Sequence, residues 1–111
     1  MRKLIFAAMV MVLAGCTVAG READGPDFVS ETIKTPQEYA RCLAPKWLAM
    51  NPATTSIETD SGYKIAASAT YYGVISLANV SSTSGGSIVE AYFPATRLGT
   101  AGWKRPVVDC L

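Results

Sequence analysis

The sequence predicts an α+β domain in which an N-terminal helix packs on a small antiparallel sheet of about four strands. Two observations carry this prediction. Residues 35–50 begin with a helix-capping pattern and place apolar side chains at three- and four-residue spacing, as one face of a helix requires. After residue 54 the period changes to two, and turn-forming residues divide the chain into short segments.

The chain begins with two positive charges, Arg2 and Lys3, and continues with an unbroken apolar run from Leu4 to Leu13. This is the pattern of a secretory signal peptide. Ten helical residues span about 15 Å, which is half of a hydrocarbon core of roughly 30 Å. The length of the run therefore disfavours a membrane-spanning helix.

The apolar run ends in Leu13-Ala14-Gly15-Cys16, and residues 1–16 together resemble the signal peptide and lipobox of bacterial lipoproteins. The resemblance implies that the Cys16 thiol receives a diacylglyceryl group, that cleavage falls before Cys16, and that its new amine is acylated, with palmitate as the expected acyl group. Two or three acyl chains anchor a protein stably, whereas one holds it only marginally. The alternative is an ordinary secreted protein in which a cysteine follows the signal by chance.

The location follows from the same resemblance. Thr17 stands where enteric lipoproteins carry the Asp that retains them in the inner membrane. We therefore expect a protein anchored in the outer membrane and facing the periplasm, with a Gram-positive cell surface as the alternative. We expect no cofactor other than the covalent lipid.

Removing residues 1–15 from a chain of 111 leaves 96 residues, enough for one small domain and a tether. The ten basic residues less Arg2 and Lys3 leave eight against nine acidic residues, a net charge of −1. The mature chain has no basic stripe, so nucleic acid is not an expected partner.

Cys42 and Cys110 remain once Cys16 is assigned to lipid. In an oxidising compartment outside the cytoplasm a disulfide is the default for such a pair, and free thiols or intermolecular pairing are the alternatives. Two cysteines in a chain without histidine do not form a usual metal site. The tail around Cys110, residues 103–111, fits either a short edge strand or a final helical turn.

Residues 16–31 are expected to form the lipidated cysteine and a flexible tether, because glycine, proline and acidic residues dominate and apolar periodicity is absent. Recognition of this segment by sorting machinery or a partner is the alternative interpretation. The folded domain is then expected over residues 32–111.

The helix is expected to begin with Thr35 as N-cap, Pro36 in the first position and Glu38 closing a capping box. Pro45 predicts a kink or break near Ala44. Asn51-Pro52 is expected to end the element. The apolar stripe consists of Tyr39, Cys42, Leu43, Trp47 and Met50, and we expect Tyr39 and Trp47 in the core.

Four segments are expected to be strands: residues 54–59, 63–70, 73–80 and 88–93. Asp60-Ser61-Gly62 is a turn signal, and residues 81–86 form a polar hairpin loop. Tyr71-Tyr72-Gly73 is expected to form a turn or a bulge. Simple alternation places Ile75 and Leu77 on one face of their strand.

No catalytic motif is visible. The chain has no histidine, which excludes a Ser-His-Asp triad and other catalysis by a histidine base. The spacing of the carboxylates does not support a glycosidase-like pair; they are Glu58, Asp60, Glu90 and Asp109. A basic cluster near the C-terminus is expected to be solvated surface, with contact to peptidoglycan or lipid phosphates as the alternative; it consists of Arg97, Lys104 and Arg105.

The leading hypothesis is therefore a non-enzymatic interaction module: an envelope lipoprotein that binds another envelope protein or peptidoglycan, as an assembly accessory, an inhibitor or a sensor. Such a module should expose an apolar or aromatic patch. The candidate residues for this interaction surface are Tyr71, Tyr72 and Trp103. The alternatives are a structural spacer lipoprotein without a discrete site and a cell-wall hydrolase.

Overall fold

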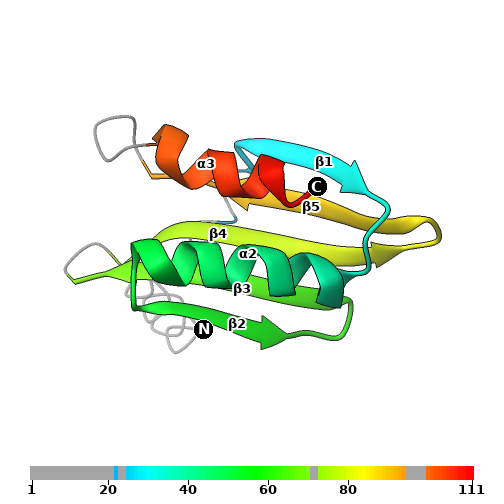
Figure 1. Cartoon of the computed structure of the whole chain (residues 1–111), viewed down its shortest axis with the longest axis horizontal. Coiled ribbons are helices and arrows are strands. Elements are labelled where there is room, and N and C mark those ends of the chain that lie inside the picture. The colour runs from blue at the N-terminus through cyan, green and yellow to red at the C-terminus, as the bar shows by residue number, and fades with distance from the viewer. Residues whose placement is uncertain (1–21, 23–24, 71–72, 95–99) are drawn as a thin grey trace, which may run out of the picture.

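The computed structural model describes residues 22, 25–70, 73–94 and 100–111. In these residues one antiparallel sheet of five strands is covered by two helices, which confirms the predicted α+β class (Figure 1). Along the chain the elements are β1 (Phe28–Thr32), α2 (Pro36–Met50), β2 (Thr54–Glu58), β3 (Gly62–Ala69), β4 (Gly73–Thr83), β5 (Gly86–Tyr92) and α3 (Thr100–Asp109). The order of the strands in the sheet is β1-β5-β4-β3-β2.

The strand β1 lies in a segment that the sequence analysis assigned to the tether. Phe28 pairs with Ala91 and Thr32 with Ser87, so β1 forms an edge strand beside β5. The prediction of a tether through residue 31 is therefore wrong from Phe28 onward. The partner of β1 lies about 60 residues later in the chain, and local composition carries no signal for pairing over such a separation. The earlier tether residues 16–21, 23 and 24 lie outside the described part of the chain.

The helix α2 begins as predicted. The Glu38 N–H donates to Thr35 Oγ1 at 3.2 Å, and the Thr35 N–H donates to Glu38 Oε1 at 3.3 Å, which completes the capping box. The helix ends at Met50, and the Asn51 N–H closes it on the Trp47 carbonyl.

We expected a kink or a break near Ala44, and no break occurs, because α2 is continuous from Pro36 to Met50 with Pro45 inside it. Pro45 is exposed, whereas Leu43 and Trp47 on either side are 0% exposed. Burial of the turns on either side of Pro45 thus keeps the helix intact, although proline removes one backbone hydrogen bond.

Both helices lie over the same face of the sheet, with α2 across its middle and α3 on the side of β1 (Figure 1). Trp47 and Trp103 meet edge to face at 5.4 Å between ring centroids, and Trp47 Nε1 donates to the Trp103 carbonyl. Tyr39 donates its hydroxyl to the Val107 carbonyl at 2.7 Å, and burial raises the pKa of Tyr39. Tyr39 and Trp47 are therefore core residues, as predicted.

The tail was expected to form either a short edge strand or a helical turn. It is helical, because residues 103–109 belong to α3. The predicted disulfide joins Cys42 on α2 to Cys110 just after α3, with the Cα atoms 5.7 Å apart. Lys34 Nζ donates to the Cys110 carbonyl, and Thr32 Oγ1 donates to Leu111 O. These bonds fix the end of the chain against the connection between β1 and α2.

A β-bulge changes the expected faces of β4. Ala67 pairs with Ser76 but Ser68 pairs with Val74, which leaves Ile75 as the extra residue. A bulge redirects side chains, so Ile75 packs against the helix-side core, while Leu77 lies on the opposite face of the sheet. The expectation that Ile75 and Leu77 share a face is wrong for this reason. No helix in the described ranges is long and apolar enough to cross a membrane.

Reduction of the Cys42–Cys110 disulfide is expected to lower the free energy of unfolding by about 4 kcal/mol, because the bond closes a long loop in the unfolded chain. The two cysteines are 68 residues apart. Urea unfolding followed by tryptophan fluorescence, with and without reductant, measures the difference. Equal unfolding midpoints for the oxidised protein and for protein with two titratable thiols would contradict it.

Candidate functional site

The sheet has a second face, opposite α2 and α3, which we call the open face. Strand register arranges its side chains in rows that run across the strands. The polar row is Val29, Glu90, Asn79, Lys64 and Ile57. The apolar row beside it is Tyr92, Leu77, Ala66 and Thr55.

A hollow of about 310 Å³ lies on the open face along the polar row. Lys64, Asn79 and Glu90 line it from three adjacent strands, together with Glu22 from the chain before β1 and Tyr92 from the apolar row. These five residues bring one cation, two carboxylates, an amide and a phenol to the hollow, and Tyr63 adds a second phenol.

An ion pair fixes Glu22 to the open face. Lys64 Nζ lies 2.7 Å from Glu22 Oε1, and about a third of each side chain is exposed. A partly exposed pair contributes about 0–1 kcal/mol. The pair thus positions the chain more than it stabilises the fold.

Tyr92 carries the clearest electrostatic perturbation in this hollow. Burial raises its pKa, and the negative charges of Glu90, Glu22 and Asp27 raise it further. The phenol therefore stays protonated well into the alkaline range and is available as a hydrogen-bond donor. Asp27 itself is held in place, because its Oδ2 accepts from the Phe93 N–H at 2.7 Å.

The apolar row forms a second, smaller cluster of buried side chains. Leu77 is 0% exposed, Tyr92 5% and Ala66 8%, with Val74 packed against them. These side chains are shielded from solvent, and the exposed large apolar side chains of this face are instead Val29 and Ile57, at the two ends of the polar row.

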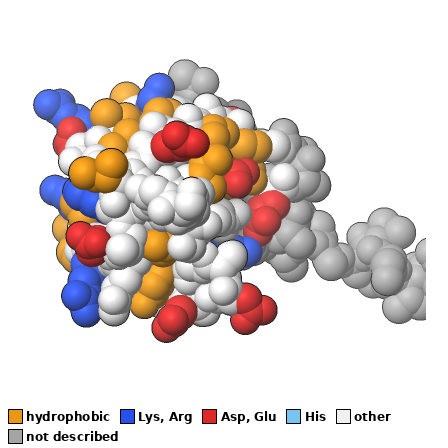
Figure 2. All heavy atoms as spheres, turned by 90° about the vertical axis from the view of Figure 1, so that its right-hand side faces the viewer, with side chains coloured by type: hydrophobic (Ala, Val, Ile, Leu, Met, Phe, Trp, Pro, Cys, Tyr) orange, Lys and Arg blue, Asp and Glu red, His pale blue; other side chains and the backbone are white. Residues whose placement is uncertain are grey.

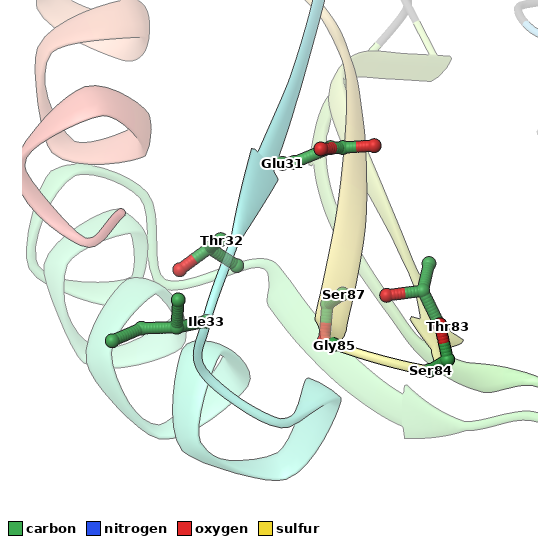
Figure 3. A pocket seen from close by; sticks show the side chains of 7 residues that line it. All are labelled: Glu31, Thr32, Ile33, Thr83, Ser84, Gly85 and Ser87. Atoms are coloured by element: carbon green, nitrogen blue, oxygen red, sulfur yellow. The ribbon is translucent and has the colours of Figure 1, made fainter.

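Another hollow, of about 380 Å³, lies between the end of β1 and the β4–β5 turn (Figure 3). Its hydroxyl groups serve the fold: Thr32 donates to Leu111 O and Ser87 to the Lys34 carbonyl. Gly86 is required here, since a Cβ atom would lie 2.1 Å from the Thr32 carbonyl oxygen. Among the described residues that line this hollow, Glu31 is the one with a charge, and the hydroxyl groups are used by the fold, so we interpret the hollow as a structural junction.

The two faces of the sheet differ in the charged side chains that they carry. Viewed from the end that carries the β4–β5 turn, Lys and Arg side chains gather on the side of the helices (Figure 2). The open face carries Lys64 against Glu22, Glu31 and Glu90. The described part of the open face is therefore acidic overall.

The residues predicted to form an interaction surface have different outcomes. Trp103 is only 7% exposed and packs on Trp47, so its prediction as a surface residue is wrong; its ring completes the contact between the helices. Tyr71 and Tyr72 lie outside the described residues, as does the lipidation residue Cys16.

The charged residues considered for catalysis or surface contact are spread over the fold. Glu58 and Asp60 lie at the β2–β3 turn, Glu90 on the open face and Asp109 on α3. Lys104 and Arg105 are exposed on α3, with Lys104 Nζ 5.6 Å from the centre of the Phe28 ring, whereas Arg97 lies outside the described residues. Among the described residues no group of three or more potential ligands could hold a metal ion.

Sequence reasoning did not single out Lys64 and Glu22. Lys64 and Ile65 are neighbours in the strand expected at residues 63–70, so alternation places their side chains on opposite faces, and the face of Lys64 could be predicted from sequence. The position of Glu22 could not, because its contact with Lys64 joins residues 42 apart in sequence.

Replacing Glu90 by Gln is expected to lower the pKa of Tyr92. The Glu90 carboxylate repels the negatively charged tyrosinate, so its removal makes deprotonation of Tyr92 easier. NMR titration of ¹³C-labelled tyrosine, with a Tyr92→Phe variant to assign the signal, measures the shift. Asp60→Asn serves as the control, since Asp60 lies at the exposed β2–β3 turn. A Tyr92 pKa that stays the same or rises in the Glu90→Gln variant would contradict the geometry of the hollow.

Comparisons with protein-family models, with curated proteins and with solved structures found no match for this chain.

Proposed function

We propose that the protein is a bacterial envelope lipoprotein, anchored in the outer membrane through acylated Cys16 and facing the periplasm, that acts as a non-enzymatic binding module. The order of basic residues, apolar run and Leu13-Ala14-Gly15-Cys16 supports the anchor. The Cys42–Cys110 disulfide supports a compartment outside the cytoplasm, because such bonds persist in oxidising surroundings.

The open face is the proposed binding surface. The observation that carries this proposal is the polar row, in which exposed Val29 and Ile57 flank the hollow lined by Lys64, Asn79 and Glu90, on a face over which neither α2 nor α3 packs. Exposed aliphatic side chains supply apolar contact area on such a surface, and the charged groups between them supply orientation.

The charge of the open face indicates the kind of partner. Glu22, Glu31 and Glu90 outnumber Lys64 on this face. An acidic rim favours an envelope protein with basic groups around an apolar contact over an anionic polymer. An assembly accessory, an inhibitor or a sensor would each use such a surface.

The spacer and the hydrolase remain the competing hypotheses. If the protein is a spacer, substitutions on any of its faces would leave its binding to other envelope components unchanged. A hydrolase would use Glu22 and Glu90, the two carboxylates that line the hollow. Against this, Glu22 is already paired with Lys64, so it is poorly placed to act as a free general base.

Charge reversal on the open face is expected to reduce capture of the partner at least about tenfold, the effect of losing 1.4 kcal/mol of binding free energy. The variants are Glu31→Lys and Glu90→Lys, which place positive charge opposite the basic partner expected above. Each is expressed as the full chain with benzoylphenylalanine in place of the exposed Ile57 and is cross-linked in intact cells by ultraviolet light. The matched control is Lys46→Glu, since Lys46 is exposed on α2.

Capture is scored as the yield of one defined cross-linked species, with the disulfide and circular dichroism used to verify folding. If all three variants capture that species as the wild type does, the open face is not the binding surface. Loss on Lys46→Glu alone would assign binding to the helical face.

A further inference from the structure

Among the described strands, β2 pairs with β3 alone and so forms an edge of the sheet, at the opposite border from β1 (Figure 1). Proteins usually protect an exposed edge with lysine, proline or a bulge. The sequence of β2 is Thr-Thr-Ser-Ile-Glu, which contains neither lysine nor proline, and its register with β3 is regular. This edge is therefore open to pairing with another strand.

The hydrogen-bond pattern shows which backbone groups of β2 face outward. Thr59 and Gly62 exchange both backbone hydrogen bonds, at 2.8 Å and 3.4 Å. Hydrogen-bonded pairs recur at every second residue of an antiparallel ladder, so Ile57 is the next residue bonded to β3. Ser56 and Glu58 alternate with these residues, and their N–H and C=O groups therefore point away from β3.

A hollow of about 270 Å³ lies beside this edge, between β2 and α2. Ser56 lines it from β2, and Arg41, Ala44 and Pro45 line it from α2. Arg41 and Glu58 are both exposed, and in the described part of the chain neither forms an ion pair. The edge thus offers outward backbone groups together with an unpaired cation and an unpaired carboxylate.

We propose that two copies of the protein pair through β2, antiparallel and with Ile57 opposite Ile57 of the second copy. In this register Ser56 lies opposite Glu58 of the second copy. Both residues have outward backbone groups, so they exchange both backbone hydrogen bonds, and symmetry repeats the exchange. A two-fold axis perpendicular to the sheet relates the copies, and the same surface of each copy forms the contact.

This register brings complementary side chains together on both faces of the sheet. On the open face Ile57, which is 59% exposed, meets its copy, and apolar surface is removed from water. On the face that α2 covers, Glu58 of the second copy lies next to Ser56, beside the hollow that Arg41 lines. A register shifted by two residues, with Ser56 on the axis, would place Ile57 opposite Thr55 and lose the apolar contact.

The pairing also determines how the two open faces lie. Because the axis is perpendicular to the sheet, both open faces lie on the same side of one continuous sheet. The polar row ends at Ile57 and therefore continues into the polar row of the second copy. The pairing rests on neither the lipid anchor nor the binding proposed above; where those hold, it doubles the binding surface.

Cysteine cross-linking tests the register. Ile57→Cys is made in the full chain, which is purified from membranes in mild detergent and oxidised gently. Ile57 and its copy form a non-hydrogen-bonded pair, with Cα atoms about 4.5 Å apart, a distance that a disulfide spans. We expect a covalent dimer of two identical chains as the main product, and none from the wild-type chain.

Thr55→Cys is the matched control, because Thr55 lies on the same face of β2 as Ile57. In the proposed register it lies about 14 Å from its copy. That distance is too long for a disulfide, so we expect at least about tenfold less dimer than from Ile57→Cys.

Charge reversal in the Ile57→Cys chain tests the contact between α2 and β2. Arg41→Glu brings carboxylates together and is expected to lower the dimer yield about fivefold or more. Combining Arg41→Glu with Glu58→Arg restores the attraction and should recover the yield. Lys46→Glu makes the same change of charge at an exposed residue of α2 that does not line the hollow, and it should leave the yield unchanged.

The pairing is overturned if Ile57→Cys gives no more dimer than Thr55→Cys, or if Arg41→Glu leaves the yield unchanged. A disulfide from Ile57→Cys to a different protein would also overturn it and assign the edge to a foreign strand. The binding proposed above fails separately. A self-dimer is recognised by twice the mass of the chain, and capture of another protein that depends on Glu90, without a self-dimer, would keep the open face and remove the pairing.

Discussion

The docking of α3 on α2 is the constraint on which the rest of the structure depends. Trp47 and Trp103 form its centre, Tyr39 donates to the Val107 carbonyl, and the Cys42–Cys110 disulfide closes one end. With both helices held side by side, a single layer covers the side chains of three central strands on one face of the sheet. Among the described residues, the fully buried aromatic side chains are Tyr39 and Trp47, and both lie in this layer, while neither α2 nor α3 packs on the other face.

This one-sided arrangement explains why the open face is the place to look for function. A five-stranded sheet of this size in a soluble domain either presents polar side chains on its second face or covers that face with something else. Here the second face carries both a charged row and a buried apolar row. The chain before β1 reaches the same face through the Glu22–Lys64 pair. Glu22, which follows the proposed lipidation residue by six positions in the sequence, thus lies at the proposed binding surface.

Local signals were sufficient for much of this fold. The capping residues Thr35 and Glu38 predicted the start of α2, and alternation predicted the strands from residue 54 onward. The pairing of two cysteines followed from composition and expected compartment. Each of these features depends on residues close in sequence or on chemistry that has few alternatives.

The features that could not be predicted from the sequence depend on contacts between residues that are far apart in the chain. The strand β1 exists because β5 offers a free edge, and α3 forms in a segment whose Pro106 and Gly102 weaken local helix preference. Trp103 was expected on the surface because its partner Trp47 lies 56 residues earlier. The bulge that separates Ile75 from Leu77 is a property of two paired strands, which alternation within one strand cannot reveal.

The measurement that tests the central claim most directly is the intact mass of the protein purified from membranes, with and without reduction. The account predicts a chain of residues 16–111 carrying a diacylglyceryl group and an N-acyl group, lighter by two hydrogens before reduction. A chain that begins elsewhere, or one with two free thiols, would contradict both the lipid anchor and the compartment on which the proposed function depends.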